Sequence, residues 1–261
     1  MSTKTDQRAK TILQVLLRHG NGSVDELAVL LDTSAASVRR DLTRLEQRGL
    51  VHRTHGGVKL TGQMEYEPFR FDSSFQEREG RFAEEKRRIG MAAAELIREN
   101  DTVGFTAGTT TTQVARCIRH RHDIHIITNA VNIGMELSNQ AALSVTLTGG
   151  MMRWAGAFSL TGPAAMETLS GVFLDKAFIG ACGVDVVRGA TTIEQDEAAV
   201  FRFMTRQAKQ VIVVADSSKI AMVSPALICP VSDIDILITD AGITEEALAG
   251  FKANGVQVLA V

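Results

Sequence analysis

Residues 34–50 read S-A-A-S-V-R-R-D-L-T-R-L-E-Q-R-G-L, and this stretch decides the fold of the N-terminal part of the chain. Its apolar residues Val38, Leu42 and Leu45 stand at i, i+4 and i+7, the spacing of the buried face of an amphipathic helix. Gly49 stands where a helix commonly ends. The pattern therefore predicts a helix that buries one face and leaves the opposite face free.

The opposite face of this helix is small, polar and basic. Small residues let a helix approach the major groove closely, and Arg, Ser and Thr side chains contact base edges and phosphates. We therefore interpret this segment as a DNA-recognition helix. The predicted DNA-binding residues on it are Ser34, Ala36, Ser37, Arg39, Arg40, Thr43 and Arg44. The alternatives are a solvated basic face or a three-helix module that binds protein.

Two further helices are expected before the recognition helix. Residues 6–18 carry an apolar stripe that stops at the glycines of residues 19–22. Ser23 is followed three residues later by Glu26, which is the pattern of a capping box, and an apolar run continues to Leu31. In a helix-turn-helix, the second helix braces the recognition helix against the DNA backbone.

A basic hairpin follows the recognition helix. Residues 51–53 and 58–60 read as two short strands around Gly56 and Gly57. Such a hairpin is typical of a wing, and we expect Arg53, His55 and Lys59 to reach phosphates or the minor groove.

The charge distribution supports this division of the chain. Residues 1–60 hold ten Lys/Arg against six acidic residues, a net charge of +4, while the rest of the chain carries −6. A small basic module attached to a larger acidic part indicates that only the former meets a polyanion. One module of this charge makes too few phosphate contacts alone, so we expect a homo-oligomer, a dimer or tetramer.

The remaining chain predicts an α/β domain. We expect residues 1–60 to form the DNA-binding domain, residues 61–79 a linker without periodicity, and residues 80–261 the second domain. Predicted strands cover residues 102–106, 124–128, 144–148, 176–180, 210–215, 235–239 and 256–261, and predicted helices 83–98, 111–119, 131–139, 162–169, 194–209 and 245–253. Short Val/Ile runs that alternate with helices predict a mostly parallel sheet covered on both faces.

Polar residues and glycines follow the strands of this sheet, where α/β proteins bind ligands. After the first strand, Gly108 permits close approach, and Thr109, Thr110 and Thr111 supply N–H groups and hydroxyls at a helix start, which suits a phosphate. The alternative is simply a helix with a Thr-rich cap. The predicted effector-binding residues are Thr106, Gly108, Thr109, Thr110, Thr111, Asn129, Gly149, Gly150, Arg153, Asp185 and Lys219.

Both halves of the chain resemble one family. The segment S-V-R-R-D-L-T-R-L-E-Q-R-G-L-V-H-R-T-H-G-G-V at residues 37–58 resembles the winged helix-turn-helix of the DeoR family of transcription regulators. A-G-T-T-T at 107, T-G-G-M-M-R at 148, F-L-D-K-A-F-I-G-A at 173 and A-D-S-S-K at 215 resemble its sensor domain, whose fold is related to ribose-5-phosphate isomerase and the coenzyme A transferases. The resemblance implies operator binding, usually repression of carbohydrate catabolism genes, relieved by a phosphorylated sugar.

Two positions depart from the family pattern. The family usually has Asp where this chain has Thr106, and Ser where it has Ala130. A carboxylate that would face a sugar hydroxyl is thereby lost, so the identity of the effector does not carry over from a relative.

The resemblance to isomerases raises the question of whether this chain has isomerase activity. In the isomerase the matching strand reads D-G-A-D-E, whereas residues 179–183 here read I-G-A-C-G and hold neither aspartate. Because an aldose–ketose isomerase needs a carboxylate base, we predict no catalytic residues. The alternatives are a sugar-phosphate-binding enzyme with an accessory DNA-binding module, and an activator built from the same parts.

Cofactors, metals and membranes are not expected. Cys117, Cys182 and Cys229 form neither a disulfide framework nor a C-x-x-C pair, and His120, His122 and His125 read as a solvated surface run. We expect Cys182 to be a structural thiol, although it is placed to line the pocket. No apolar run is long enough for a membrane span and no signal peptide begins the chain, so a cytoplasmic protein is expected.

Overall fold

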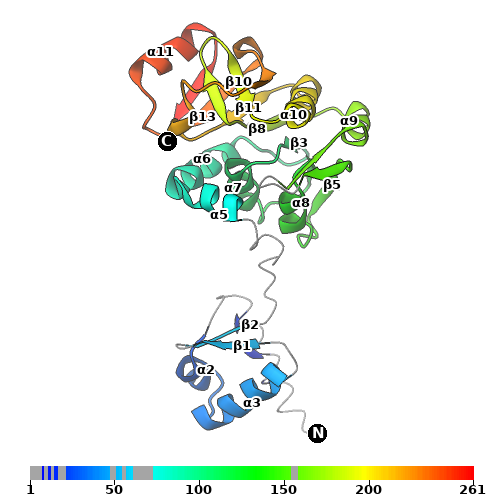
Figure 1. The fold of residues 1–261 in the computed structure, drawn as a ribbon. Coiled ribbons are helices and arrows are strands. Elements are labelled where there is room, and N and C mark those ends of the chain that lie inside the picture. Colours follow the sequence, from blue (N-terminus) through cyan, green and yellow to red (C-terminus); the bar gives the residue numbers. More distant parts are fainter. Residues whose placement is uncertain are drawn as a thin grey trace. The chain divides into compact units, whose positions relative to one another are not determined.

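The chain forms two compact units, Met1–Phe71 and Asp72–Val261. The computed structural model describes residues 22–47, 51–54, 57–60, 73–153 and 158–261, together with Arg8, Thr11, Ile12, Val15 and Leu16 (Figure 1).

The N-terminal unit contains the predicted helices and hairpin. Of the first predicted helix the structure describes five residues, all helical, while the others lie outside the described residues. Helix α2 (Val24–Leu30) begins with the predicted capping box, in which Glu26 N–H donates to Ser23 Oγ at 3.1 Å and Ser23 N–H to Glu26 Oε2 at 2.8 Å. Helix α3 (Ala35–Gln47) follows. Strands β1 (Val51–Thr54) and β2 (Gly57–Leu60) pair antiparallel, as expected for the wing.

One apolar core holds this unit together. It comprises Ile12, Leu16, Leu27, Val38, Leu42, Leu45, Val51 and Val58, each buried. Gly22 and Val58 exchange backbone hydrogen bonds of 3.0 and 2.8 Å, so the segment before α2 is paired with the wing. At Gly57 a Cβ would stand 2.7 Å from the Gly22 oxygen, so this close approach of two backbones requires glycine.

Part of the predicted linker is helical. All but the last residue of helix α5 (Ser73–Gly80) lie within the range expected to be irregular, and the helix belongs to the second unit. Its apolar residue Phe75 is 4% exposed and packs edge-on against Phe158, with ring centroids 5.2 Å apart. A single buried aromatic residue gives no periodic signal, which is why the sequence pattern misses this helix.

The second unit is built on a parallel sheet of seven strands. Their order is β14-β13-β11-β8-β3-β4-β5, and every neighbouring pair is parallel. The strands are β3 (Thr102–Phe105), β4 (Ile124–Thr128), β5 (Leu143–Leu147), β8 (Lys176–Gly180), β11 (Val211–Val214), β13 (Ile236–Thr239) and β14 (Gln257–Ala260). All seven strands predicted from the sequence are therefore present in this sheet.

Helices cover the sheet on both faces, as the fully buried strands β11 and β13 require. They are α6 (Ala83–Glu95), α7 (Thr109–Cys117), α8 (Val131–Leu137), α9 (Pro163–Ser170), α10 (Gln195–Gln207) and α11 (Glu245–Ala253). In Figure 1, α6 and α7 lie together on one side and α10 on the other. At Gly104 a Cβ would stand 2.9 Å from Met204 Sδ, so α10 packs directly on β3 at this glycine.

Two small antiparallel sheets accompany the large one. Strands β9 (Gly183–Asp185), β10 (Gly189–Thr192) and β12 (Ala226–Cys229) form one, and β6 (Met151–Arg153) with β7 (Ser159–Thr161) the other. The sequence pattern does not predict these short strands, because no helical segment separates β6 from β7 or β9 from β10, as helical segments separate most strands of the large sheet. In the described part of the chain no helix is long and apolar enough to cross a membrane.

Candidate functional site

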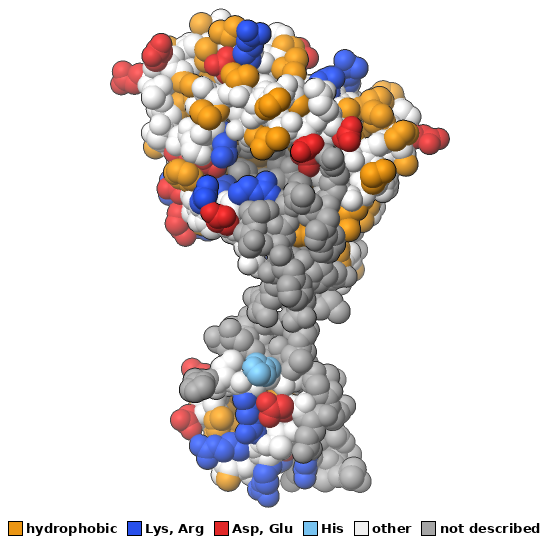
Figure 2. Space-filling model, in the orientation of Figure 1, with side chains coloured by type: hydrophobic (Ala, Val, Ile, Leu, Met, Phe, Trp, Pro, Cys, Tyr) orange, Lys and Arg blue, Asp and Glu red, His pale blue; other side chains and the backbone are white. Residues whose placement is uncertain are grey.

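Helix α3 presents the predicted basic face to its surroundings. Val38, Leu42 and Leu45 are buried, with at most 1% of each exposed. The exposed residues on and beside the other face include Ala36, Arg39, Arg40, Thr43 and Arg44, with Ser34 exposed just before the helix and Ser37 half-buried. Figure 2 shows Lys and Arg side chains gathered on the visible face of this unit. The structure thus brings the predicted contact residues of this helix onto one surface.

Two of these residues also shape the start of the helix. Ser37 N–H donates to Ser34 Oγ at 3.3 Å, and the two hydroxyl oxygens lie 3.0 Å apart. Ser34 therefore acts as an N-cap. Arg40 Nη2 donates to Ser37 Oγ at 3.3 Å, so its guanidinium lies near the N-terminal end of α3.

Asp41 orients the first helix against α3. Its carboxylate is 3% exposed and accepts from Arg8 Nε at 2.9 Å, while Arg44 Nη1 lies 4.0 Å away. This contact was not predicted. It removes one negative charge from the outer surface, because Asp41 is buried under the basic face.

The wing is fastened to α3 by Arg53. Its guanidinium donates to the Arg39 carbonyl at 2.7 Å and to Thr43 Oγ1 at 2.6 Å, and Arg53 Nε lies 3.5 Å from Glu46 Oε2. In this structure Arg53 holds the two elements together, whereas the sequence suggested a phosphate contact. His55 lies outside the described residues, as does the Lys59 side chain.

The second unit contains a cavity of about 400 Å³ at the carboxyl ends of β3, β8 and β11. Three loops of the sheet contribute: residues 107–110, residues 180–182, and Asp216, Ser218 and Lys219. The other lining residues are Arg78, Arg81, Phe82, Lys86, Thr192, Glu197 and Phe201. The cavity therefore lies where a parallel α/β sheet is expected to bind a ligand.

The start of α7 forms one wall of this cavity. Gly108, Thr109 and Thr110 line it, and among the described residues the N–H groups of Thr109 and Thr110 have no hydrogen-bond partner. The hydroxyls of Thr111 and Thr112 instead donate to the Gly108 carbonyl at 2.9 and 2.7 Å. Unpaired N–H groups at a helix start favour an anion, so this wall suits a phosphate or carboxylate group.

A buried ion pair lies opposite. Lys86 is 4% exposed, and its Nζ lies 3.8 Å from Asp216 Oδ2. The ammonium also donates to the carbonyl of Arg78 at 2.5 Å and to that of Arg81. Burial lowers the pKa of Lys86 and Lys219 lowers it further, while the Asp216 carboxylate opposes both effects. Hydrogen bonds from Ser218 to Asp216, one from N–H at 3.2 Å, support the carboxylate.

The lining charges favour an anionic ligand. Basic groups come from Arg78, Arg81, Lys86 and Lys219, and acidic ones from Glu197 and Asp216. Lys219 ends a short 3₁₀ helix, Ser217–Lys219, and makes no ion pair with any residue that the structure describes. Its ammonium is therefore available to a ligand, while the two carboxylates can accept hydrogen bonds from hydroxyl groups.

Several residues predicted for this site lie elsewhere. Thr106 is fully buried below the cavity, where its Oγ1 accepts from Gly180 N–H at 2.9 Å. Asn129 is also buried; it donates to Ser159 Oγ and the Leu160 carbonyl and accepts from Ala107 N–H at 3.0 Å. Both side chains thus fix the backbone around the cavity and are not among its lining residues.

The glycines and Asp185 belong to turns. Gly149 and Gly150 have φ of +71° and +111°, and a Cβ at Gly150 would stand 2.4 Å from the Thr161 carbonyl oxygen. Asp185 Oδ1 accepts from the N–H groups of Val187 and Arg188, at 2.9 and 2.8 Å, and so closes the turn between β9 and β10. The side chain of Arg153 lies outside the described residues.

The cavity also contains residues that sequence reasoning missed. Arg78 lies in the predicted linker and Arg81 just after it, and the sequence there has no periodicity that would indicate a buried or functional residue. Lys86 carried a usable signal, since it stands three residues before Ile89 on the apolar stripe of α6, and both are buried. A lysine in such a stripe must find a buried partner.

The cysteines show no feature of a redox or metal site. Cys182 lines the cavity with its Sγ 3.6 Å from Thr192 Oγ1. Cys229 is 1% exposed, and burial raises its pKa to about 12. Within the described ranges no group of three or more His, Cys, Asp or Glu residues could hold a metal ion.

A basic winged-helix unit joined to an α/β unit with a polar ligand cavity defines a DNA-binding regulator that senses a small molecule. Comparison with known protein families gives the same class. The family model described as DeoR-like helix-turn-helix domain matches residues 8–63, and that described as DeoR C terminal sensor domain matches residues 81–241.

Two similar proteins extend over nearly the whole chain. The HTH-type transcriptional repressor GlcR of Bacillus subtilis is 34% identical over 97% of this chain and 95% of its own length. The HTH-type transcriptional regulator GlpR of Haloferax volcanii is 33% identical over 97% of this chain and 96% of its own length.

Solved structures are similar in fold only. The sorbitol operon regulator SorC of Klebsiella pneumoniae covers 96% of this chain and 100% of its own, at 14% identity and a TM-score of 0.40. Ribose 5 phosphate isomerase A of Neisseria gonorrhoeae covers 52% of each chain, at 16% identity and a TM-score of 0.38.

The chain belongs to the DeoR family of transcriptional regulators. It is a DNA-binding regulator and not an enzyme, and its ligands are operator DNA and a sugar effector. The predicted family, fold class and regulatory function are thereby confirmed.

Proposed function

We propose that this protein represses genes of carbohydrate catabolism in the cytoplasm, bound to its operator as a homo-oligomer. A phosphorylated sugar or polyol enters the cavity of the sensor unit and releases the protein from DNA. Release requires that the ligand bind the DNA-free conformation more tightly, because equal affinity for both conformations would shift nothing.

The DNA contacts proposed for the N-terminal unit centre on α3. The exposed guanidinium groups of Arg39, Arg40 and Arg44 reach bases or phosphates, and the small residues Ala36 and Ser37 allow the close approach. Ser34 and Thr43 complete this surface, and His55 and Lys59 remain proposed contacts of the wing. Two such units related by a two-fold axis would read a palindromic or repeated site.

The effector contacts proposed for the sensor unit follow from its charges. The phosphate binds the N–H groups of Thr109 and Thr110 and is neutralised by Lys219, while the sugar hydroxyls donate to Asp216 and Glu197. Arg153 remains a proposed contact. The observation that carries the proposal is the opening of the α7 N-terminus into a cavity rich in basic side chains.

A thermal-shift screen tests the ligand class. Phosphorylated sugars and polyols are compared with their unphosphorylated counterparts, and a ligand at about 100 times its Kd should stabilise the folded protein by about 2.7 kcal/mol. Lys219→Met should abolish the shift, whereas Lys252→Met in the exposed last turn of α11 should leave it unchanged. Equal shifts from both members of each sugar pair would reject the phosphate.

Activation instead of repression is decided by a reporter gene. If the protein is a repressor, its deletion raises expression from the cognate promoter, and the R39A/R40A double variant has the same effect. Lower expression in either strain would make it an activator at that promoter.

A further inference from the structure

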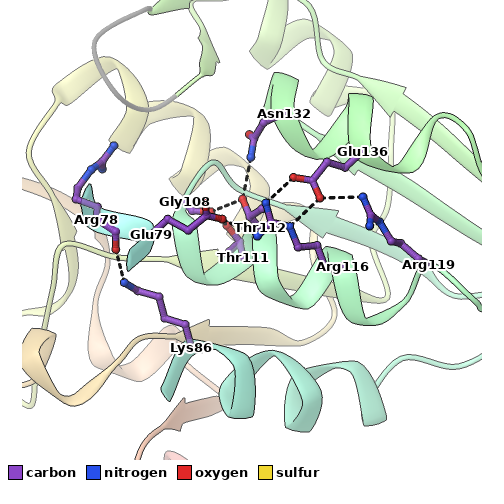
Figure 3. Close-up of polar contacts among 10 residues, drawn as sticks. All are labelled: Arg78, Glu79, Lys86, Gly108, Thr111, Thr112, Arg116, Arg119, Asn132 and Glu136. Carbon is purple, nitrogen blue, oxygen red and sulfur yellow. Dashed lines mark hydrogen bonds and ion pairs between the residues drawn. The ribbon is translucent and has the colours of Figure 1, made fainter. Parts of the chain in front are cut away.

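Helix α5 is attached at two places to α6 and α7, the helices that contribute Lys86, Thr109 and Thr110 to the cavity lining (Figure 3). Glu79 Oε1 accepts from Arg116 Nη1 of α7 at 2.6 Å. Lys86 of α6 donates to the carbonyls of Arg78 and Arg81, at the C-terminal end of α5 and just beyond it. Since α5 begins at Ser73, it is the first described helix of the sensor unit after the chain leaves the DNA-binding unit.

Lys86 stands between α5 and the ligand space. It lines the cavity, and its ammonium is shared between two backbone carbonyls and the Asp216 carboxylate. The carbonyls of a last helical turn have no partner within the helix, so Lys86 supplies what α5 lacks there. An anion in the cavity offers this ammonium a fourth, charged partner that competes with the carbonyls.

Two arginines at the end of α5 and just beyond it also respond to an anion. Arg78 and Arg81 both line the cavity, so a bound anion attracts these guanidinium groups as well as Lys86. A bound anion in the cavity therefore has two effects. It competes for the ammonium that binds the carbonyls of Arg78 and Arg81, and it attracts the guanidinium groups of the same two residues.

The second attachment links α5 to α7, the helix whose first turn lines the cavity. Arg116 lies in the last turn of α7, whose first turn lines the cavity, and it pairs with Glu136 of α8 through two contacts of 2.8 Å. Glu136 also accepts from Arg119 at 3.2 Å. Arg116 is thus held in place by α8, and Glu79 of α5 is fastened to a fixed point.

We infer that α5 is the coupling helix of this regulator: anion binding draws Lys86, Arg78 and Arg81 toward the ligand and turns α5 about the Glu79–Arg116 ion pair near its C-terminal end. Of the described helices of the sensor unit, α5 is the nearest in sequence to the DNA-binding unit. The inference rests on the proposed anion seat at α7.

Hydrogen exchange of the full-length protein tests both steps separately. Inorganic phosphate is the probe, compared with chloride at equal ionic strength. We expect phosphate to protect the amides of residues 109–112 and to change exchange in residues 77–82 at least fivefold. Protection at 109–112 without any change in 77–82 would overturn the coupling and leave the anion seat intact. No protection at 109–112 would remove the seat on which both rest.

A variant of the pivot removes its negative charge. Glu79 does not line the cavity, so Glu79→Gln should leave phosphate protection of residues 109–112 within twofold of wild type. The additional weakening of operator binding by phosphate over chloride should be lost in this variant. The matched control is Glu95→Gln, which breaks the Glu95–Arg121 pair of 3.3 Å and should retain the response. A normal operator response in Glu79→Gln would refute the role of the ion pair.

Discussion

The ammonium of Lys86 lies 3.8 Å from the carboxylate of Asp216, and only 5% and 2% of these side chains are exposed. A buried pair of this kind is costly to break, because removal of one partner leaves the other charge without compensation. In this protein the pair also sits in the wall of the ligand cavity. Its contribution to folding and its role toward a ligand must therefore be measured separately.

A double-mutant cycle measures the pair. Lys86→Met and Asp216→Asn should each lower the free energy of unfolding, Lys86→Met by about 3–5 kcal/mol because a buried carboxylate is left unpaired. The double variant should lose about 1–3 kcal/mol less than the sum of the two. The same cycle on the exposed Arg87–Glu84 pair should give nearly no coupling. Additive losses at Lys86 and Asp216 would mean that the two charges do not interact.

The sensor unit should need α5 to be stable. A fragment of residues 72–261 keeps the buried Phe75 and the Glu79–Arg116 ion pair, whereas a fragment of residues 81–261 loses both. Loss of a buried Phe side chain alone costs about 3–5 kcal/mol, so the shorter fragment should unfold at clearly lower denaturant concentration. Equal midpoints for the two fragments would contradict the placement of α5 in this unit.

Arg40 and Arg53 should differ in what they affect. Arg40→Ala should weaken operator binding by about 1–3 kcal/mol if the side chain contacts a base, and leave stability unchanged. Arg53→Ala removes the contacts of the wing with Thr43 and Glu46 and should lower the stability of the N-terminal unit by about 1 kcal/mol. Chemical denaturation and fluorescence anisotropy on labelled operator separate the two effects. Loss of stability in Arg40→Ala would place that residue in the fold instead of the interface.

The sheet was predictable because its strands have a clear sequence pattern. Strands such as β11, V-I-V-V, are short apolar runs buried on both faces, and helical segments separate most of the seven. Most strands of the small antiparallel sheets offered no such signal. Strand β10 reads G-A-T-T and forms through long-range contacts, with Gly189 so close to Cys229 that a Cβ would stand 2.2 Å from its carbonyl oxygen.

The lining residues of the cavity were predictable where they directly follow a strand. Gly108, Thr109 and Lys219 follow their strands and line the cavity, as the rule for parallel sheets suggests. Asn129 and Asp185 also stand beside strands, but their polar groups satisfy neighbouring backbone atoms, which spacing alone cannot reveal. Arg78 of α5 and Arg81 just after it reach the cavity through tertiary packing only.

Asp175 should make stability depend on pH. Its carboxylate accepts from Lys209 Nζ at 2.8 Å and from Thr102 N–H at 2.9 Å, and these contacts, Lys209 first, hold its pKa below the ordinary value of 3.8. A depressed folded pKa gives stability that is present above the unfolded pKa and lost as pH falls through the folded one. The difference in unfolding free energy between wild type and Asp175→Asn should therefore be constant near pH 7 and shrink below pH 3.8.

Urea titrations at a series of pH values measure this difference. The control is Glu167→Gln, an exposed carboxylate on α9, which should show little difference at any pH. An Asp175→Asn difference that grows toward acid would reverse the sign of the linkage and contradict the assigned contacts.

The most direct test of the account is operator release in a variant whose cavity is filled. Gly180 lines the cavity, and a Cβ there would meet its nearest neighbour, Thr111 Cγ2, at 3.5 Å, an ordinary contact, so Gly180→Val should fold and add apolar bulk to the cavity wall. Gly171→Val is the control, since Gly171 has open space around it and lies outside the cavity lining. The measurement is the fraction of labelled operator bound as each sugar phosphate of the screen, or its unphosphorylated counterpart, is added.

We predict that at least one phosphorylated compound releases wild type and Gly171→Val, that its unphosphorylated counterpart does not, and that Gly180→Val binds operator normally without release. Equal release by the unphosphorylated compound, or normal release of Gly180→Val, would contradict the assignment of this cavity as the effector site.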